Sequence, residues 1–214
     1  MARRLSSIPV VPLVAGLLLA LVAAVTLFWY ASPKLLSRYM DAFGPEVQIN
    51  SVLRLHEAET KLAAAKTEYD RWITLGDVAM ARAAFADRVD ADVLAKELLA
   101  MAQQPAFRND WNYGNAVHRA NSSLGRIALR NGDKAAARDY LLASVNTQGS
   151  PQMNSFGPNM LLAKEMLDAN EQDAVLQYLT RCRTFWTMGH DNLDVWTQMI
   201  RDGKRPRFGP NLLY

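Results

Sequence analysis

The chain has a single cysteine, Cys182, and three histidines among its 214 residues. One cysteine cannot form an intrachain disulfide, and no histidine stands in a His-Glu-x-x-His or paired-cysteine pattern of the kind that binds metal. The serine-hydrolase pattern Gly-x-Ser-x-Gly, the phosphate-binding Gly-Lys-Ser/Thr and the dinucleotide-binding Gly-x-Gly-x-x-Gly are also missing. We therefore expect no metal ion, no cofactor and no catalytic activity.

The chain after residue 38 has no excess of basic charge. Arg3, Arg4, Lys34 and Arg38 account for four of the 24 basic residues, which leaves 20 basic against 21 acidic residues. Nucleic-acid-binding domains usually carry a clearly basic surface. The one basic cluster, at residues 201–207, is of a kind that is usually solvated or paired with nearby acids. We expect no nucleic-acid partner.

No charged residue occurs between residues 5 and 33. About 20 apolar residues in a helix cross the hydrocarbon core of a bilayer, and residues 10–30 supply that length, ending in an aromatic belt at 28–30. A cleaved signal peptide is the alternative, but its apolar core would be shorter, and Trp29 would stand three positions before a cut after Ala31. These features favour an uncleaved single-span anchor.

Basic residues flank this segment on both sides. The amino terminus, Arg3 and Arg4 precede it, and Lys34 and Arg38 follow it. The positive-inside rule favours, by one charge, an amino terminus in the cytoplasm. In a bacterium the chain would then be a single-pass inner-membrane protein with its C-terminal domain in the periplasm.

The rest of the chain lacks the long Val/Ile/Thr alternation that is typical of strands. Alanine occurs throughout, with Gly, Asn, Asp or Pro at regular intervals, which indicates an all-α fold with short turns. Apolar residues recur at three- and four-residue steps over 50–72, which predicts one amphipathic helix there. We expect four parts: an anchor with a cytoplasmic tip (1–33), connecting helices (34–74), a helical repeat domain (75–204) and a C-terminal tail (205–214). The expected helices of the repeat domain are three pairs and a capping helix, at 75–86 with 91–104, 114–130 with 134–145, 159–168 with 172–186, and 192–201.

The middle pair shows the repeated design most clearly. Gly125 allows close approach of the paired helix, Gly132 ends the first helix in a left-handed turn, and Asp133 can cap the second. Gly125 and Gly132 stand seven residues apart, and Ala137 falls where a small residue is expected. The pair resembles a tetratricopeptide repeat, although Asn121 replaces the tryptophan of that motif, and the flanking copies recur at spacings of 42 and 38 residues. A degenerate tetratricopeptide-like array of α-hairpins is the expected architecture.

A narrower resemblance rests on three stretches, at residues 111–118, 149–159 and 181–186. They are similar to a family of uncharacterised bacterial tetratricopeptide-like proteins, many of which carry an N-terminal signal or anchor. The similarity covers about residues 70–214. It implies the fold and an envelope location, and it assigns no activity and no functional residue.

Two segments combine amides with aromatic rings just before a predicted helix pair. In stacked helical hairpins such segments lie on one edge, where amides and rings together can hold a peptide backbone or a sugar. The alternative, which turn chemistry favours, is that these residues cap helices and fill gaps between repeats. The candidate partner-binding residues are Trp111, Asn112, Tyr113, Asn115, His118, Asn121, Asn154, Phe156 and Asn159.

These features predict a membrane-anchored interaction or assembly module whose partners are proteins, themselves membrane-associated. The alternative is a small-ligand-binding protein or an enzyme that uses the 111–121 and 154–159 loops with His118 as a base. That alternative needs a second polar group near His118 and an enclosed pocket. Cys182 is predicted to pack as a small hydrophobe, the alternative being a thiol activated by Arg181 and Arg183.

Overall fold

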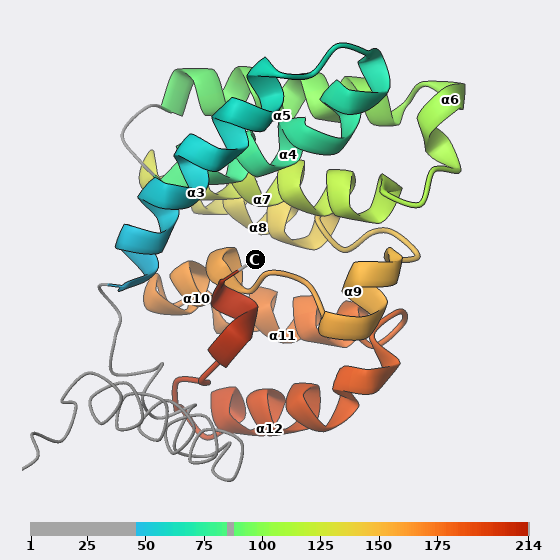
Figure 1. The fold of residues 1–214 in the computed structure, drawn as a ribbon. Helices are drawn as coiled ribbons and strands as arrows, with labels where there is room; N and C mark the ends of the chain where they lie inside the picture. Colours follow the sequence, from blue (N-terminus) through green and yellow to red (C-terminus); the bar gives the residue numbers. More distant parts are fainter. Residues whose placement is uncertain (1–45, 85–87, 214) are drawn as a thin grey trace, which may run out of the picture. The chain divides into compact units, whose positions relative to one another are not determined.

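A computed structural model describes residues 46–84 and 88–213, with side chains described from residue 54 onward except at 85–89. These residues form helices joined by short connections, without a strand, so the all-α prediction is confirmed for the part described (Figure 1). All of them belong to one compact unit, 44–214. Its elements in chain order are α3 (Glu46–Ala63), α4 (Glu68–Ala84), α5 (Arg88–Ala102), α6 (Pro105–Arg108), α7 (Tyr113–Arg130), α8 (Lys134–Ala143), α9 (Pro151–Phe156), α10 (Leu161–Asp168), α11 (Gln172–Cys182), the 3-10 turn η1 (Thr187–Gly189), α12 (His190–Arg201) and the 3-10 turn η2 (Gly209–Leu212).

The single helix predicted over 50–72 is wrong, because the chain turns between Ala63 and Glu68. Thr67 and Asp70 form a reciprocal cap at the start of α4: Asp70 Oδ2 accepts from the Thr67 amide at 3.0 Å, and Thr67 Oγ1 accepts from the Asp70 amide at 3.0 Å. The turn at residues 64–67 contains no glycine or proline, so this cap marks where α4 starts. The result is a hairpin in which α3 packs on α4.

The predicted helix pairs are present, and most of their limits agree within three residues, but α4 begins at Glu68 and not at 75, and α11 ends at Cys182 and not at 186. The second helix of each pair contacts the first, as α4 and α5, α7 and α8, and α10 and α11 show. The first helix of a pair also contacts both helices of the pair before it: α7 contacts α4 and α5, and α10 contacts α7 and α8. The helices are therefore stacked in sequence order, and α12 packs against α11 at the end of the stack (Figure 1).

Three residues of the middle pair do what the sequence predicts. Gly132 has a φ of 83° just after α7 ends, and a β-carbon on Gly125 would lie 3.2 Å from Tyr140 Cβ on the paired helix. The same β-carbon would lie 2.4 Å from Leu162 Cδ2 on α10. Asp133 caps α8, because its Oδ1 accepts from the Ala136 amide at 2.9 Å.

Replacing Asp133 with alanine is expected to lower the free energy of unfolding by about 1 kcal/mol, the usual value of an N-cap side chain. Urea denaturation followed by circular dichroism measures this. Asp133→Asn should retain most of the stability, because an amide oxygen also accepts from the Ala136 amide. An equal loss in the two variants would mean that the charge, and not the cap, is what α8 needs.

Among the described residues, two large apolar cores and a small third cluster (Ala83, Ala91 and Ile127) hold the stack. The first joins α4, α5 and α7 with α6, and its centre is Trp72, fully buried and stacked on Phe107 at a ring-centroid distance of 4.7 Å. The second joins α8, α10, α11 and α12, where Trp196 contacts both Trp186 and Phe208. The C-terminal segment is part of this second core, since Phe208 is 2 % exposed.

Among the helices in the described part of the chain, none is long and apolar enough to cross a membrane. The predicted anchor, residues 1–33, lies outside the described residues.

Candidate functional site

His118 joins three segments that are far apart in the sequence. Its side chain is buried in α7, where Nδ1 lies 3.3 Å from the Ser144 carbonyl at the end of α8. Its Nε2 accepts a hydrogen bond from the Asn159 amide at 3.1 Å. These contacts fix the neutral tautomer with the proton on Nδ1. Burial lowers the pKa of His118 to about 4, so the ring is uncharged near neutral pH.

A second buried chain of hydrogen bonds links the start of α7 to the start of α9. Asn115 Nδ2 donates to Asn112 Oδ1 at 3.0 Å, and Asn115 Oδ1 accepts from Ser150 Oγ at 2.7 Å. Ser150 also caps α9 by accepting from the Met153 amide. The predicted loop at 154–159 is thus in part the short helix α9, whose start is marked by Ser150 and Pro151.

The 111–121 and 154–159 segments do meet, through His118 and Asn159. Asn159 is itself tied down, because its carbonyl accepts from the Tyr178 hydroxyl at 3.2 Å and its side chain accepts from the Leu161 amide at 2.8 Å. Asn121 only bonds to the Val117 carbonyl on its own helix. These amides therefore hold the turns in place.

The exposed members of the predicted set lie elsewhere. Trp111 is 53 % exposed and donates to the Tyr69 hydroxyl at 2.9 Å, which brings the 109–112 turn onto the start of α4. Phe156 is 64 % exposed at the end of α9, and Asn154 is also exposed. None of these three, nor Tyr113, lines the cleft described next.

A cleft of about 320 Å³ lies between α3, α4 and α7 on one side and the connection between α9 and α10 with the C-terminal tail on the other. Three of the predicted residues, Asn115, His118 and Asn159, line it. Its apolar lining comes from Ala58, Met80, Ala81, Ala84, Met153, Gly157, Pro158, Leu161, Leu212 and Leu213. Its polar and charged lining comes from Arg54, Glu57, Lys61, Asp77, Asn115, His118, Arg119, Arg126, Gln152 and Asn159.

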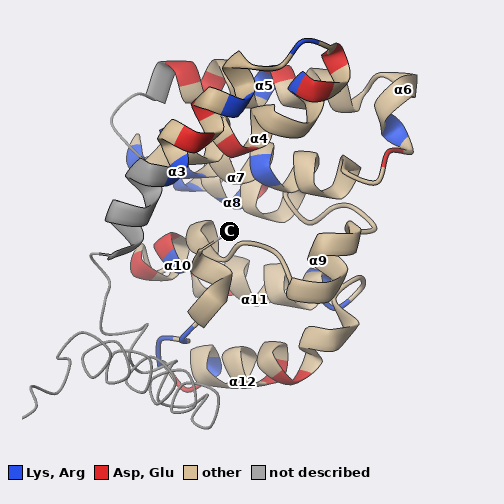
Figure 2. Ribbon diagram, in the orientation of Figure 1, with Lys and Arg blue, Asp and Glu red and all other residues tan. Residues whose placement is uncertain are grey.

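Charge is distributed unevenly around the cleft. Figure 2 shows residues of both signs along α3, α4 and α5, whereas α9 and its connection to α10 carry none. The lining includes four cations, at positions 54, 61, 119 and 126, and two carboxylates, Glu57 and Asp77. Those carboxylates are paired, Glu57 with Lys61 at 2.6 Å and Asp77 with Arg119 at 3.1 Å. The lining therefore has a net positive charge.

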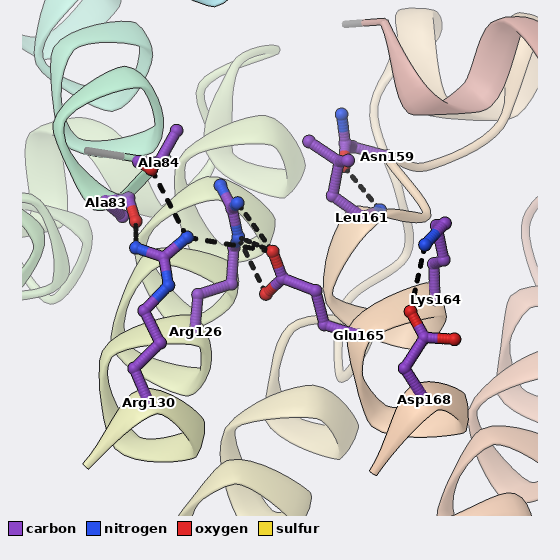
Figure 3. A network of polar contacts seen from close by, with 9 residues as sticks. All are labelled: Ala83, Ala84, Arg126, Arg130, Asn159, Leu161, Lys164, Glu165 and Asp168. Carbon is purple, nitrogen blue, oxygen red and sulfur yellow. Dashed lines mark hydrogen bonds and ion pairs between the residues drawn. The ribbon is translucent and has the colours of Figure 1, made fainter. Parts of the chain in front are cut away.

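Arg126 is the most deeply buried of these cations. Its side chain is 6 % exposed and binds Glu165 on α10 through Nε and Nη2, the shorter contact being 2.6 Å (Figure 3). Arg130 lies 3.7 Å from the same carboxylate and also donates to the carbonyls of Ala83 and Ala84. Arg126 Nη1 is buried and has no hydrogen-bond partner among the described residues.

The hydrogen bonds of His118 give its side chain a structural role. A base must have a free nitrogen that faces a substrate proton, and both nitrogens of His118 are used by backbone groups. Arg126 could not be singled out from the sequence, because its partner Glu165 lies 39 residues away. The only local signal was its place beside Gly125, at the helix crossing.

Two other candidates are inert in this structure. Cys182 is fully buried, and burial raises the pKa of its thiol well above the ordinary value, so it packs as a small hydrophobe as predicted. The described residues contain no group of three or more His, Cys, Asp or Glu side chains that could hold a metal ion.

Comparison with known proteins gives this chain no relative: no protein-family model, no curated protein and no solved structure matches it.

Proposed function

We propose that this chain is a membrane-anchored interaction module that binds a segment of another protein in the cleft between α3, α4, α7 and the α9–α10 connection. The observation that carries the proposal is the cleft itself, which combines an apolar lining with amides and cations and in which both ring nitrogens of His118 are bonded to backbone groups. Its volume is at the low end of the range for ligand sites, which suits a short stretch of chain.

The order of helix contacts supports a tetratricopeptide-like array. Each first helix touches both helices of the preceding pair, and Gly125, Gly132 and Ala137 stand at close-packing and turn positions. Arrays of this kind bind peptide segments on surfaces formed by successive repeats. Residues 10–30 would anchor the array, in a bacterium to the inner membrane with the domain in the periplasm, so that the partners are membrane-associated proteins.

The C-terminal tail of the chain itself forms part of the cleft lining, which supports a protein segment as the ligand. The C-terminal tail is fixed by backbone groups, since the Met160 amide donates to the Asn211 carbonyl at 2.8 Å. Asn211 Nδ2 donates to the carbonyls of Phe156 and Pro158 at 3.0 and 3.1 Å. Leu212 and Leu213 then lie at the cleft. Backbone groups at and after the end of α9 therefore already bind a segment of the chain.

Site-specific photo-crosslinking in the native host tests the proposal. A photoreactive side chain at Met80 or Gln152, both at the cleft, is expected to give the same crosslinked protein from each position. Val195 on α12 is 57 % exposed and is not part of the cleft, so it serves as the control and should not give that product. The absence of any product from the two cleft positions, or the same product from all three, would refute the assignment of the cleft.

A further inference from the structure

We propose that the segment bound in the cleft is acidic, and that Arg126 binds its carboxylate; this inference rests on the proposed function. An ionised group that is buried without a full set of hydrogen bonds is costly, so native structures seldom leave one. Arg126 Nη1 is such a group, and it belongs to a residue that lines the cleft.

The pairing of Arg126 with Glu165 does not satisfy the guanidinium. Glu165 receives Nε and Nη2, which leaves the Nη1 edge unused (Figure 3). Glu165 also faces Arg130 at 3.7 Å, so this carboxylate is shared between two guanidiniums. A second carboxylate would accept from Arg126 Nη1 in a charge-assisted hydrogen bond.

The rest of the lining favours an acidic protein segment over a free anion. The same cleft is lined by Leu161 and, along α4, by the apolar side chains of Met80, Ala81 and Ala84. Such a surface suits the side chains that flank a carboxylate in a peptide, whereas inorganic phosphate or acetate would leave it uncovered. Charge complementarity points the same way, because the four lining cations face three carboxylates, those of Glu57, Asp77 and Glu165, which leaves one positive charge in excess.

A random dodecapeptide library displayed on phage, panned on the full-length protein in detergent micelles, tests the inference. Wild-type protein should enrich peptides in which Asp or Glu stands beside apolar residues. Arg126→Gln should lose that enrichment. Its affinity for the selected peptides should be lower by a factor of about ten or more, as expected when a charge-assisted hydrogen bond is removed. Arg71→Gln is the matched control, because Arg71 also pairs with a glutamate, Glu97, but lies outside the cleft.

The Arg126→Gln protein leaves Glu165 with one arginine fewer, so its thermal unfolding is followed by circular dichroism. The double variant Arg126→Gln/Glu165→Gln removes both members of the pair and should show the same loss of acidic selectivity. Enrichment of peptides without acidic residues would overturn the role of Arg126 and leave the proposed function standing. Failure to enrich any peptide would overturn both. If inorganic phosphate stabilises the protein in a way that depends on Arg126, and no peptide is enriched, the ligand of Arg126 is a small anion and the proposal of an acidic segment is overturned.

Discussion

Replacing Gly114 with alanine is expected to lower the free energy of unfolding by roughly 3 kcal/mol or more, the upper part of the range for overpacked sites. A β-carbon at this position would lie 2.0 Å from the Gly149 carbonyl oxygen and 2.9 Å from the Ser150 amide nitrogen. Both are backbone atoms, so no side chain can rotate to relieve the clash. The 149–150 turn would have to move, and with it the hydrogen bond from Ser150 to Asn115.

Two other glycine-to-alanine substitutions, neither with a backbone clash, serve as controls for Gly114→Ala. A β-carbon on Gly76 would lie 2.9 Å from Arg119 Cδ and 3.2 Å from Leu98 Cδ2, both of them side-chain atoms that can shift. Alanine also gains about 1 kcal/mol of helix propensity, so Gly76→Ala should be close to neutral. Gly132→Ala meets nothing within 4 Å but must adopt a φ of 83°, which costs about 1 kcal/mol. Denaturant unfolding of the three variants gives the ranking. If Gly114→Ala were as stable as Gly76→Ala, the contact between α7 and the 149–150 turn would be wrong.

His118→Ala is expected to lower the free energy of unfolding by roughly 4 kcal/mol at neutral pH, from a buried cavity and two buried backbone groups without partners. The Asn159 amide and the Ser144 carbonyl both lose their hydrogen bond to the ring. His56→Ala is the control: this histidine is exposed on α3, and its loss should change stability by no more than about 0.5 kcal/mol.

The contribution of His118 should also depend on pH. The pKa of the folded ring is lowered from 6.5 to about 4, so between these values the unfolded chain binds a proton that the folded chain does not. Stability from this group is therefore present above about pH 6.5 and declines as the pH falls toward 4, by up to roughly 3 kcal/mol.

The difference in unfolding free energy between the wild type and His118→Ala, measured from pH 7 to pH 4.5, isolates this effect because the carboxylates are common to both proteins. The difference should shrink as the pH falls. A difference that stays constant, or an imidazole that titrates near pH 6.5 in NMR spectra of the folded protein, would contradict the buried, doubly bonded ring.

The parts of the fold that the sequence predicts well depend on local chemistry. The boundary between α7 and α8 follows from Gly132 and Asp133, which need a left-handed turn and a cap regardless of what surrounds them. The break between α3 and α4 was missed because apolar residues keep their spacing through it. Its signal was present in Thr67 and Asp70, a capping box that periodicity alone does not register.

The candidate site was predicted only in part, for a different physical reason. The nature of Asn115, His118 and Asn159 indicated that polar groups gather near two turns, and the structure brings these three to one cleft. A polar side chain near a turn can bind a partner or can hold the turn itself, and only the packed structure decides which. Here the His118 ring and the Asn159 side chain accept hydrogen bonds from backbone amides of the turn. Arg126 could not be predicted, because its pairing with Glu165 on α10 and the burial of its Nη1 atom arise only when the helices pack together.

Hydrogen–deuterium exchange of the full-length protein tests the central claim most directly. It is measured with and without the partner segment that crosslinking identifies, added without a covalent link. Binding in the cleft predicts slower exchange at residues 54–61, 77–84 and 152–161, the three stretches that contribute most of its lining. Protection confined to the exposed turn around Trp111 and Tyr69, or to α12, would place the partner on another surface and contradict the claim.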